Sequence, residues 1–434
     1  MEIRPTVYLY CDQVTPRVTY TFQFIFEDVL QLSWQILDTL ADLPTNGVLI
    51  NYSSRKQFGG IYIEPNGLLS EHEIKNEALE SIREVLNQIK SGQFDVDIFS
   101  FIFFSITRYE EYLIKERDNL GRFLYRNSIL NDAKLGLHPF VDLTLRWLCQ
   151  KMHESYPHIQ VPCNMQYNFV STVDVDQPWQ YAHKGINNFL GILRDIISIK
   201  FREIGSRLNS ILKPETDTFN QFDRIATIHK QYGIDKPIYF FLLGFRRNKL
   251  DRNHKPSNKK LIKLIQSLSV HHTIGLHPSY RSNKKTKFLQ KEKAALEKIL
   301  QVNAIYSRQH FILLDLPKTY RTLNEIGIKH DFSMGYPDCV GYRAGTGYNF
   351  FWYDLKNEQK TDLIIHPFTV MDVTLQKYMG LKPNEAIDFY YELVKTARQT
   401  GTPMTIIWHN NSLSDAGDWK GWDKVYSYLL KISK

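Results

Sequence analysis

The chain has 434 residues, of which 43% are hydrophobic and 23% are charged. This length and apolar content predict two or three domains with a substantial core, and they exclude a disordered, collagen-like or disulfide-stapled small protein. The net charge of +8 is small for this size, and no recognisable DNA- or RNA-binding module accompanies it, so nucleic acid is excluded as an expected partner.

The first 14 residues lack the apolar core of a secretory signal, and the longest apolar run, 98–106, is too short to span a bilayer. The four cysteines, Cys11, Cys149, Cys163 and Cys339, follow neither CxxC nor any other regular spacing. These observations predict a reduced, cytoplasmic protein without a transmembrane segment.

The first part of the chain, 1–155, contains both helix-like and strand-like patterns of apolar residues. It predicts a smaller α/β domain of unknown role. Strands are expected at 6–11 and 47–51, and helices at 26–43, 70–89, 97–116 and 141–153. No group of residues here has the density of a catalytic site.

From 165 to 434 short apolar runs alternate with helical patterns. This alternation predicts a parallel β/α architecture, and the number of units favours a closed or nearly closed barrel. The expected strands are 167–173, 238–243, 273–276, 304–307, 363–365 and 404–408, and the expected helices are 222–231, 259–268, 287–300, 320–326, 383–400 and 423–432.

Polar residues follow most of these strands, and barrel enzymes carry their chemistry at this rim. An isolated pair of aspartates is more typical of a turn or helix cap, and a lone histidine of a solvated residue. Their repetition at successive strand ends favours one shared site. The residues are Asp174, Asp176, His277, Arg308, His310, His366 and His409.

The types of these residues suggest metal-assisted hydrolysis. One carboxylate and neutral imidazoles can hold a divalent cation, and a second carboxylate can act as base. A nearby arginine would keep that base ionised, and a further histidine could protonate the leaving group.

The same segments resemble the motifs of polysaccharide deacetylases with a NodB-type domain. The segments, in chain order, are STVDVDQPW at 171–179, IYFFLLG at 238–244, HHTIGLHPSYRS at 271–282, RQHF at 308–311 and IIWHNN at 406–411. The resemblance covers about 165–434. Longer runs such as RYEEY and SMGYPDCVGYRAGT are similar to a bacterial subgroup with an uncharacterised N-terminal domain.

The resemblance implies a distorted (β/α) barrel, the NodB-like deacetylase fold, and a metal-dependent carbohydrate deacetylase acting on an amino sugar or glycan. It implies that Asp174 is the general base, that Arg308 orients it, and that His409 is the general acid. Asp176 and His277 would bind Zn²⁺ or another divalent transition metal.

One position departs from the family pattern, because Arg281 stands where the second histidine ligand belongs. His310 is the expected substitute. Weak metal binding and loss of the chemistry are the two other outcomes consistent with this replacement. Trp179, Tyr280, Arg281 and Arg343 are the candidate substrate-binding residues, with a structural salt bridge as the alternative for Arg343.

Two rival functions stay open at this point. A non-catalytic carbohydrate-binding or assembly protein would keep the rim without the metal. A metal-free glycoside hydrolase would pair Asp174 with another carboxylate, such as Asp338 or Asp372. The basic stretches at 246–263 and 284–298 are expected to be solvated surface, with a docking patch for an anionic partner as the alternative.

Overall fold

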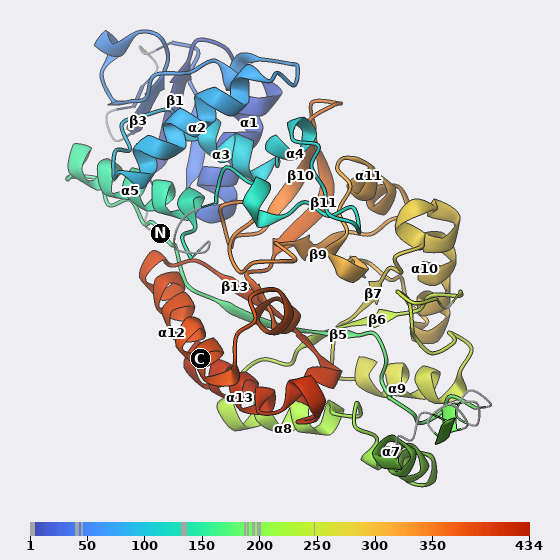
Figure 1. Ribbon diagram of the computed structural model, residues 1–434. Helices are drawn as coiled ribbons and strands as arrows, with labels where there is room; N and C mark the ends of the chain where they lie inside the picture. The colour runs from blue at the N-terminus through green and yellow to red at the C-terminus, as the bar shows by residue number, and fades with distance from the viewer. Residues whose placement is uncertain are drawn as a thin grey trace.

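The computed structural model describes residues 5–39, 43–44, 47–131, 137–185, 188, 191–192, 196–197, 201–246 and 248–434. Two β-sheets with surrounding helices make up this part of the chain (Figure 1). The strands are β1 (Thr6–Cys11), β2 (Ser33–Ile36), β3 (Val48–Tyr52), β4 (Ile61–Tyr62), β5 (Phe169–Val175), β6 (Ile238–Leu242), β7 (Ile274–His277), β8 (Tyr306–Ser307), β9 (His330–Met334), β10 (Phe350–Asp354), β11 (Gln359–Pro367), β12 (Val370–Met371) and β13 (Met404–His409). The α-helices are α1 (Pro16–Phe22), α2 (Glu77–Lys90), α3 (Ile98–Ile106), α4 (Glu110–Leu113), α5 (Phe140–Ser155), α7 (Phe201–Leu212), α8 (Phe222–Tyr232), α9 (Lys259–Ser269), α10 (Thr286–Leu300), α11 (Lys318–Glu325), α12 (Pro383–Thr400) and α13 (Trp422–Ser433).

The N-terminal sheet is small and entirely parallel, with the order β2-β1-β3-β4. All five residues of β3 are buried, which is typical of a parallel strand covered on both faces. Helices α1, α2 and α3 lie beside this sheet in Figure 1. The predicted strands at 6–11 and 47–51 are confirmed.

The second sheet is larger and has the order β10-β11-β9-β8-β7-β6-β5-β13-β12. All neighbours are parallel except β10 and β11. The sheet curls on itself, because the backbone N–H of Phe368 donates to Met334 at the end of β9 while that of the next residue, Thr369, donates to Thr405 in β13. The predicted fold class, a distorted barrel preceded by a smaller N-terminal α/β part, is confirmed.

Local signals explain the helices around the barrel. Helix α12 begins with Pro383, whose fixed φ suits the first helical position, and ends before Gly401 at φ 68°. A Cβ at Gly401 would lie 2.6 Å from the carbonyl oxygen of Met165, so glycine is required there for space as well as for its backbone angle.

Contacts between the two parts of the chain are extensive. The β10–β11 hairpin packs on α1, where Arg17 forms an ion pair with Glu358 (2.6 Å) and the Tyr20 hydroxyl donates to the carbonyl of Phe351 (2.6 Å). One hydrophobic cluster includes buried residues of both sheets. The domain limits 1–155 and 165–434 stay a prediction.

Several predicted elements differ from the observed ones. The expected helix at 26–43 is wrong, because a π-helix at Gln23–Val29 is followed by β2; residues 40–42 lie outside the described residues. The expected helix at 97–116 is divided into α3 and α4 at Arg108, whose φ is +54°. Strand β9 was not expected, because its buried Asp331 and Ser333 interrupt the apolar pattern.

The cysteine prediction is also wrong in one respect. Cys149 in α5 and Cys163 in the segment after it form a disulfide, with their Cα atoms 6.1 Å apart, while Cys11 and Cys339 are free. The spacing of 14 residues does not reveal this pairing, because it depends on the chain turning back along α5. Within the described ranges, no helix is long and apolar enough to cross a membrane.

Candidate metal and hydrolytic site

Six of the seven strand-end candidates meet at one rim of the barrel because of the strand register, whereas His366 stacks on Phe332 and contacts His330. Asp174 of β5 is the direct partner of His409 in β13, and His277 of β7 is the partner of Leu242 in β6. Arg308 and His310 follow β8, which pairs with β7. Parallel strands therefore deliver all of these side chains to the same end of the sheet.

Asp176, His277 and His310 form the only group of three acidic, histidine or cysteine side chains with metal-ligand spacing among the described residues. Their ligand atoms lie within 4.8 Å of one another. Oδ1 of Asp176 is 3.4 Å from Nε2 of His277 and 3.4 Å from Nε2 of His310. One carboxylate and two imidazoles are a donor set suited to zinc.

Hydrogen bonds to the far side of each ring orient the two imidazoles. Nδ1 of His277 donates to the carbonyl oxygen of Arg308 (2.6 Å), which leaves Nε2 with its lone pair facing the cluster. Nδ1 of His310 lies 3.1 Å from Oδ1 of Asp251. Nε2 of His277 and Oδ1 of Asp176 are buried without a hydrogen-bond partner among the described residues, so the donor set fits a bound cation.

The electrostatics of the cluster favour a positive charge. Burial alone would lower the pKa of His310, but Asp176 and Asp251 raise it to about 9. Burial likewise opposes ionisation of Asp176, yet the two imidazoles hold its pKa well below the usual range. A proton and a metal ion compete for such a site, because a ligating imidazole is neutral.

Asp174 lies beside this cluster and is held by Arg308. Nη1 of Arg308 donates to Oδ1 of Asp174 (2.8 Å) and to Oγ1 of Thr172 (2.6 Å). The guanidinium is fully buried, and its Cζ lies 4.5 Å from the ring centroid of Phe240. Oδ2 of Asp174 is 3.8 Å from Nε2 of His277, so the second carboxylate oxygen faces the cluster.

His409 completes the rim and is held by Asp372, which follows β12. Oδ1 of Asp372 lies 2.8 Å from Nδ1 of His409, and Oδ2 accepts from the backbone N–H of His409 (2.8 Å). Burial would lower the pKa of His409, but the Asp372 carboxylate outweighs it and raises the pKa to about 9. The imidazole is therefore protonated at neutral pH and can donate a proton.

These side chains open into a single cavity of about 280 Å³. That volume is near the lower end for small-molecule sites. Asp174, Asp176, His277, His310 and His409 all line it. The aromatic rings of Phe311, Tyr378 and Trp419 line it as well.

The candidate substrate-binding residues lie elsewhere. Trp179 is buried and packs edge-on against His183 and His254. Arg281 lies over the ring of Phe288 in α10, 4.6 Å from its centroid, and Tyr280 packs against Phe311. None of the three lines the cavity. Arg281 therefore does not place its charge at the cluster.

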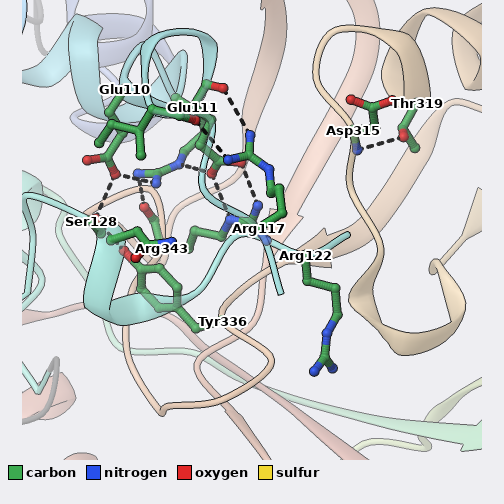
Figure 2. A network of polar contacts seen from close by, with 12 residues as sticks. Glu110, Glu111, Arg117, Arg122, Ser128, Asp315, Thr319, Tyr336 and Arg343 are labelled. Atoms are coloured by element: carbon green, nitrogen blue, oxygen red, sulfur yellow. Dashed lines mark hydrogen bonds and ion pairs between the residues drawn. The ribbon is translucent and has the colours of Figure 1, made fainter. Parts of the chain in front are cut away.

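Arg343 is likewise outside the cavity, in a buried ion-pair network with Glu111 that is seen in Figure 2. Asp338, a candidate for the glycosidase alternative, accepts from the backbone N–H of Tyr125 and does not line the cavity. Asp372 does not line it either; it is fully buried, and both of its oxygens bind His409.

Two residues of the site were not predicted from the sequence. Asp251 lies in the basic stretch after β6, and its carboxylate orients His310. Arg122 comes from the N-terminal part of the chain yet lines the cavity. A lone carboxylate among lysines and arginines was the only available signal for Asp251, and Arg122 offered none.

Residues 7–157 match a family of unknown function, DUF7033, which covers less than half of the chain. A search of curated proteins finds no match. Solved structures with similarity include a protein described as a polysaccharide deacetylase from Mycobacterium smegmatis, with 14% identity and a TM-score of 0.39 over 60% of this chain and 83% of that one.

Two further solved structures are similar at the same low level. One is an allantoinase, with 13% identity and a TM-score of 0.34 over 47% of this chain and 64% of that one. The other is described as a polysaccharide deacetylase from Pseudomonas aeruginosa, with 10% identity and a TM-score of 0.35 over 48% of this chain and 64% of that one.

Proposed function

We propose that this protein is a metal-dependent carbohydrate deacetylase that removes an acetyl group from an amino sugar or glycan. One observation carries the proposal: a potential ligand set, an arginine-held carboxylate and a carboxylate-held histidine line the same cavity. The motif resemblance of 165–434 to NodB-type deacetylases supports the same assignment.

Asp176, His277 and His310 would hold a zinc or similar divalent ion. When bound, the ion would polarise the acyl carbonyl and make water more acidic. Asp174 accepts the proton of the attacking water at Oδ2, because Oδ1 is bound to Arg308. His409 then donates its Nε2 proton to the departing amine or alkoxide, while Asp372 holds Nδ1.

The first test is removal of the base. Asp174→Asn in the zinc-loaded protein is expected to lower acetate release from N-acetylglucosamine oligomers by about 100-fold or more, the usual contribution of a general base. Zinc content should stay unchanged, because Asp174 is outside the proposed ligand set. Asp338→Asn is the matched control, since its carboxylate does not line the cavity and accepts from the backbone N–H of Tyr125.

The outcomes separate the three functions considered. Acetate release that stops on chelation and returns with zinc supports the deacetylase. Cleavage of glycosidic bonds that survives chelation would replace it with a hydrolase of the metal-free class. Zinc binding below about 0.1 equivalent, without either activity, would favour the non-catalytic protein.

A second prediction concerns pH. Because His409 acts in its protonated form, activity is expected to fall as the pH rises through about 9. In Asp372→Asn the largest raising contribution to the His409 pKa is gone, while burial still lowers it and Asp176 and Asp174 still raise it, so this fall in activity should move to lower pH. Rate profiles between pH 6 and 10 measure the shift, and an unchanged upper limb would contradict the role of Asp372.

A further inference from the structure

The cavity is lined by an excess of cationic side chains that has no role in the deacetylation of a neutral sugar. Three cationic side chains outside the metal-ligand cluster line it: Arg122, Arg252 and Lys377. They come from three segments, namely the turn after α4, the loop after β6, and the π-helical turn at Thr374–Tyr378 that follows β12.

The acidic residues of the cavity do not balance two of these cations, Arg252 and Lys377. Asp174 is paired with Arg308, and Asp176 faces the two imidazoles. Neither Arg252 nor Lys377 forms an ion pair with any described residue, and both side chains are exposed. An exposed pair of cations beside a partly enclosed cavity raises the local concentration of anions there.

Arg122 is held in place by its own turn. The Asp118 carboxylate accepts from Nε and Nη2 of Arg122 (2.8 and 2.6 Å) and from the backbone N–H groups of Leu120 and Arg122. Gly121 between them has φ +91°. The turn is therefore rigid, and the Arg122 guanidinium lies 5.2 Å from the ring centroid of Tyr378, next to Lys377 in the chain.

This arrangement links the N-terminal part of the chain to the cavity. In Figure 2 the Arg122 side chain points away from the ion-pair network around Glu111 and Arg343. The network fixes the same N-terminal region against the barrel loops. Arg122 and Tyr378 both line the cavity, with the guanidinium over the tyrosine ring.

We propose that the substrate carries an anionic group, a phosphate or a carboxylate, which Arg252 and Lys377 bind beside Arg122. The N-terminal part then completes the substrate site instead of only flanking the barrel. This inference rests on the proposed deacetylase function and names the class of its substrate.

Binding can be measured without turnover in the zinc-loaded Asp174→Asn protein. The probes are N-acetylglucosamine, its 1-phosphate and its 6-carboxylate analogue, titrated by calorimetry at low and high salt. The anionic sugar is expected to bind about tenfold or more tightly than the neutral one, with the preference reduced by salt. The phosphate and carboxylate arms identify which anion the site prefers.

The double variant Arg252→Gln/Lys377→Gln should remove most of that preference and leave the affinity for N-acetylglucosamine unchanged. Lys377→Arg keeps the charge and should retain the preference. Lys291→Gln/Lys298→Gln is the matched control, because it also removes two charges and both lysines are exposed α10 residues that do not line the cavity. An equal effect of this control would overturn the inference, since it would assign the preference to net charge alone.

Acetate release by the protein with Asp174 intact separates this inference from the proposed function. Equal binding of the neutral and both anionic sugars overturns the anionic subsite, whether or not acetate is released. A charge preference that depends on Arg252 and Lys377, without acetate release from any probe, retains the subsite and contradicts the deacetylase.

Discussion

Replacing His310 with glutamine is expected to weaken zinc binding by more than about 100-fold. Loss of a residue that only hydrogen-bonds to a metal ligand already costs about 10–100-fold in affinity, and His310 is a proposed ligand itself. His310 is the expected third ligand, and its Nε2 lies 3.4 Å from Oδ1 of Asp176. Competition with a chromophoric chelator measures the affinity directly. Acetate release should fall with zinc occupancy and recover in part at high zinc concentration.

Two further variants define the role of His310. Asp251→Asn should weaken zinc binding by about tenfold, because it alters the group that orients Nδ1 without removing a ligand. Arg281→Gln should leave the affinity unchanged, because its guanidinium lies over Phe288. An unchanged affinity in His310→Gln, or a large gain in Arg281→Gln, would show that the metal ligands are other residues.

The position of Arg281 illustrates why motif spacing was informative only in part. The family pattern places a histidine four residues after His277, where this chain has Arg281. In the structure Glu292 of α10 accepts from the hydroxyl and backbone N–H of Ser279, and Asp251 accepts from the N–H of Tyr280. These long-range contacts set the turn, and they direct Arg281 toward α10.

The strand ends themselves were predictable, since apolar runs mark buried parallel strands and the polar residue after each run falls at their common rim. The pairing of those rim residues with carboxylates was not, although Asp372 itself was a candidate rim carboxylate. Asp372 follows β12, a strand of two residues, and Asp251 lies in a loop without regular structure. Short strands and loop carboxylates have no periodicity, so their contacts depend on the assembled barrel.

Contacts between the two parts of the chain were equally absent from the sequence prediction, and one of them is an ionic network with every member buried. Arg343, in the loop after β9, donates from Nε and Nη2 to both oxygens of Glu111 in α4 (2.8 and 2.6 Å). Arg108 donates to Glu111 and to Glu110, and its guanidinium also donates to the carbonyl of Arg343. Figure 2 shows Glu110, Glu111 and Arg343 gathered in this network.

Arg343→Met is therefore expected to lower the free energy of unfolding by about 3–5 kcal/mol, the usual loss when one partner of a buried ion pair is removed. The reason is that Glu111 stays buried with one of its two arginines gone. Burial opposes its ionisation, but Arg343 and Arg108 hold its pKa at about 2. Chemical denaturation at pH 7, followed by fluorescence, measures the change.

The pH dependence of that loss follows from the direction of the Glu111 shift. Because the pKa of Glu111 is depressed, its ionised carboxylate stabilises the folded protein at pH values above 4.5, the ordinary pKa of glutamate. This stabilisation disappears as the pH falls toward about 2. Without Arg343 the folded-state pKa of Glu111 rises, so the difference in stability between variant and parent should shrink as the pH falls from the variant's raised pKa toward about 2. Arg83→Met is the matched control, because its pair with Glu80 is exposed and should contribute less than about 1 kcal/mol. Equal losses for the two variants would mean that the buried network does not hold the N-terminal part against the barrel.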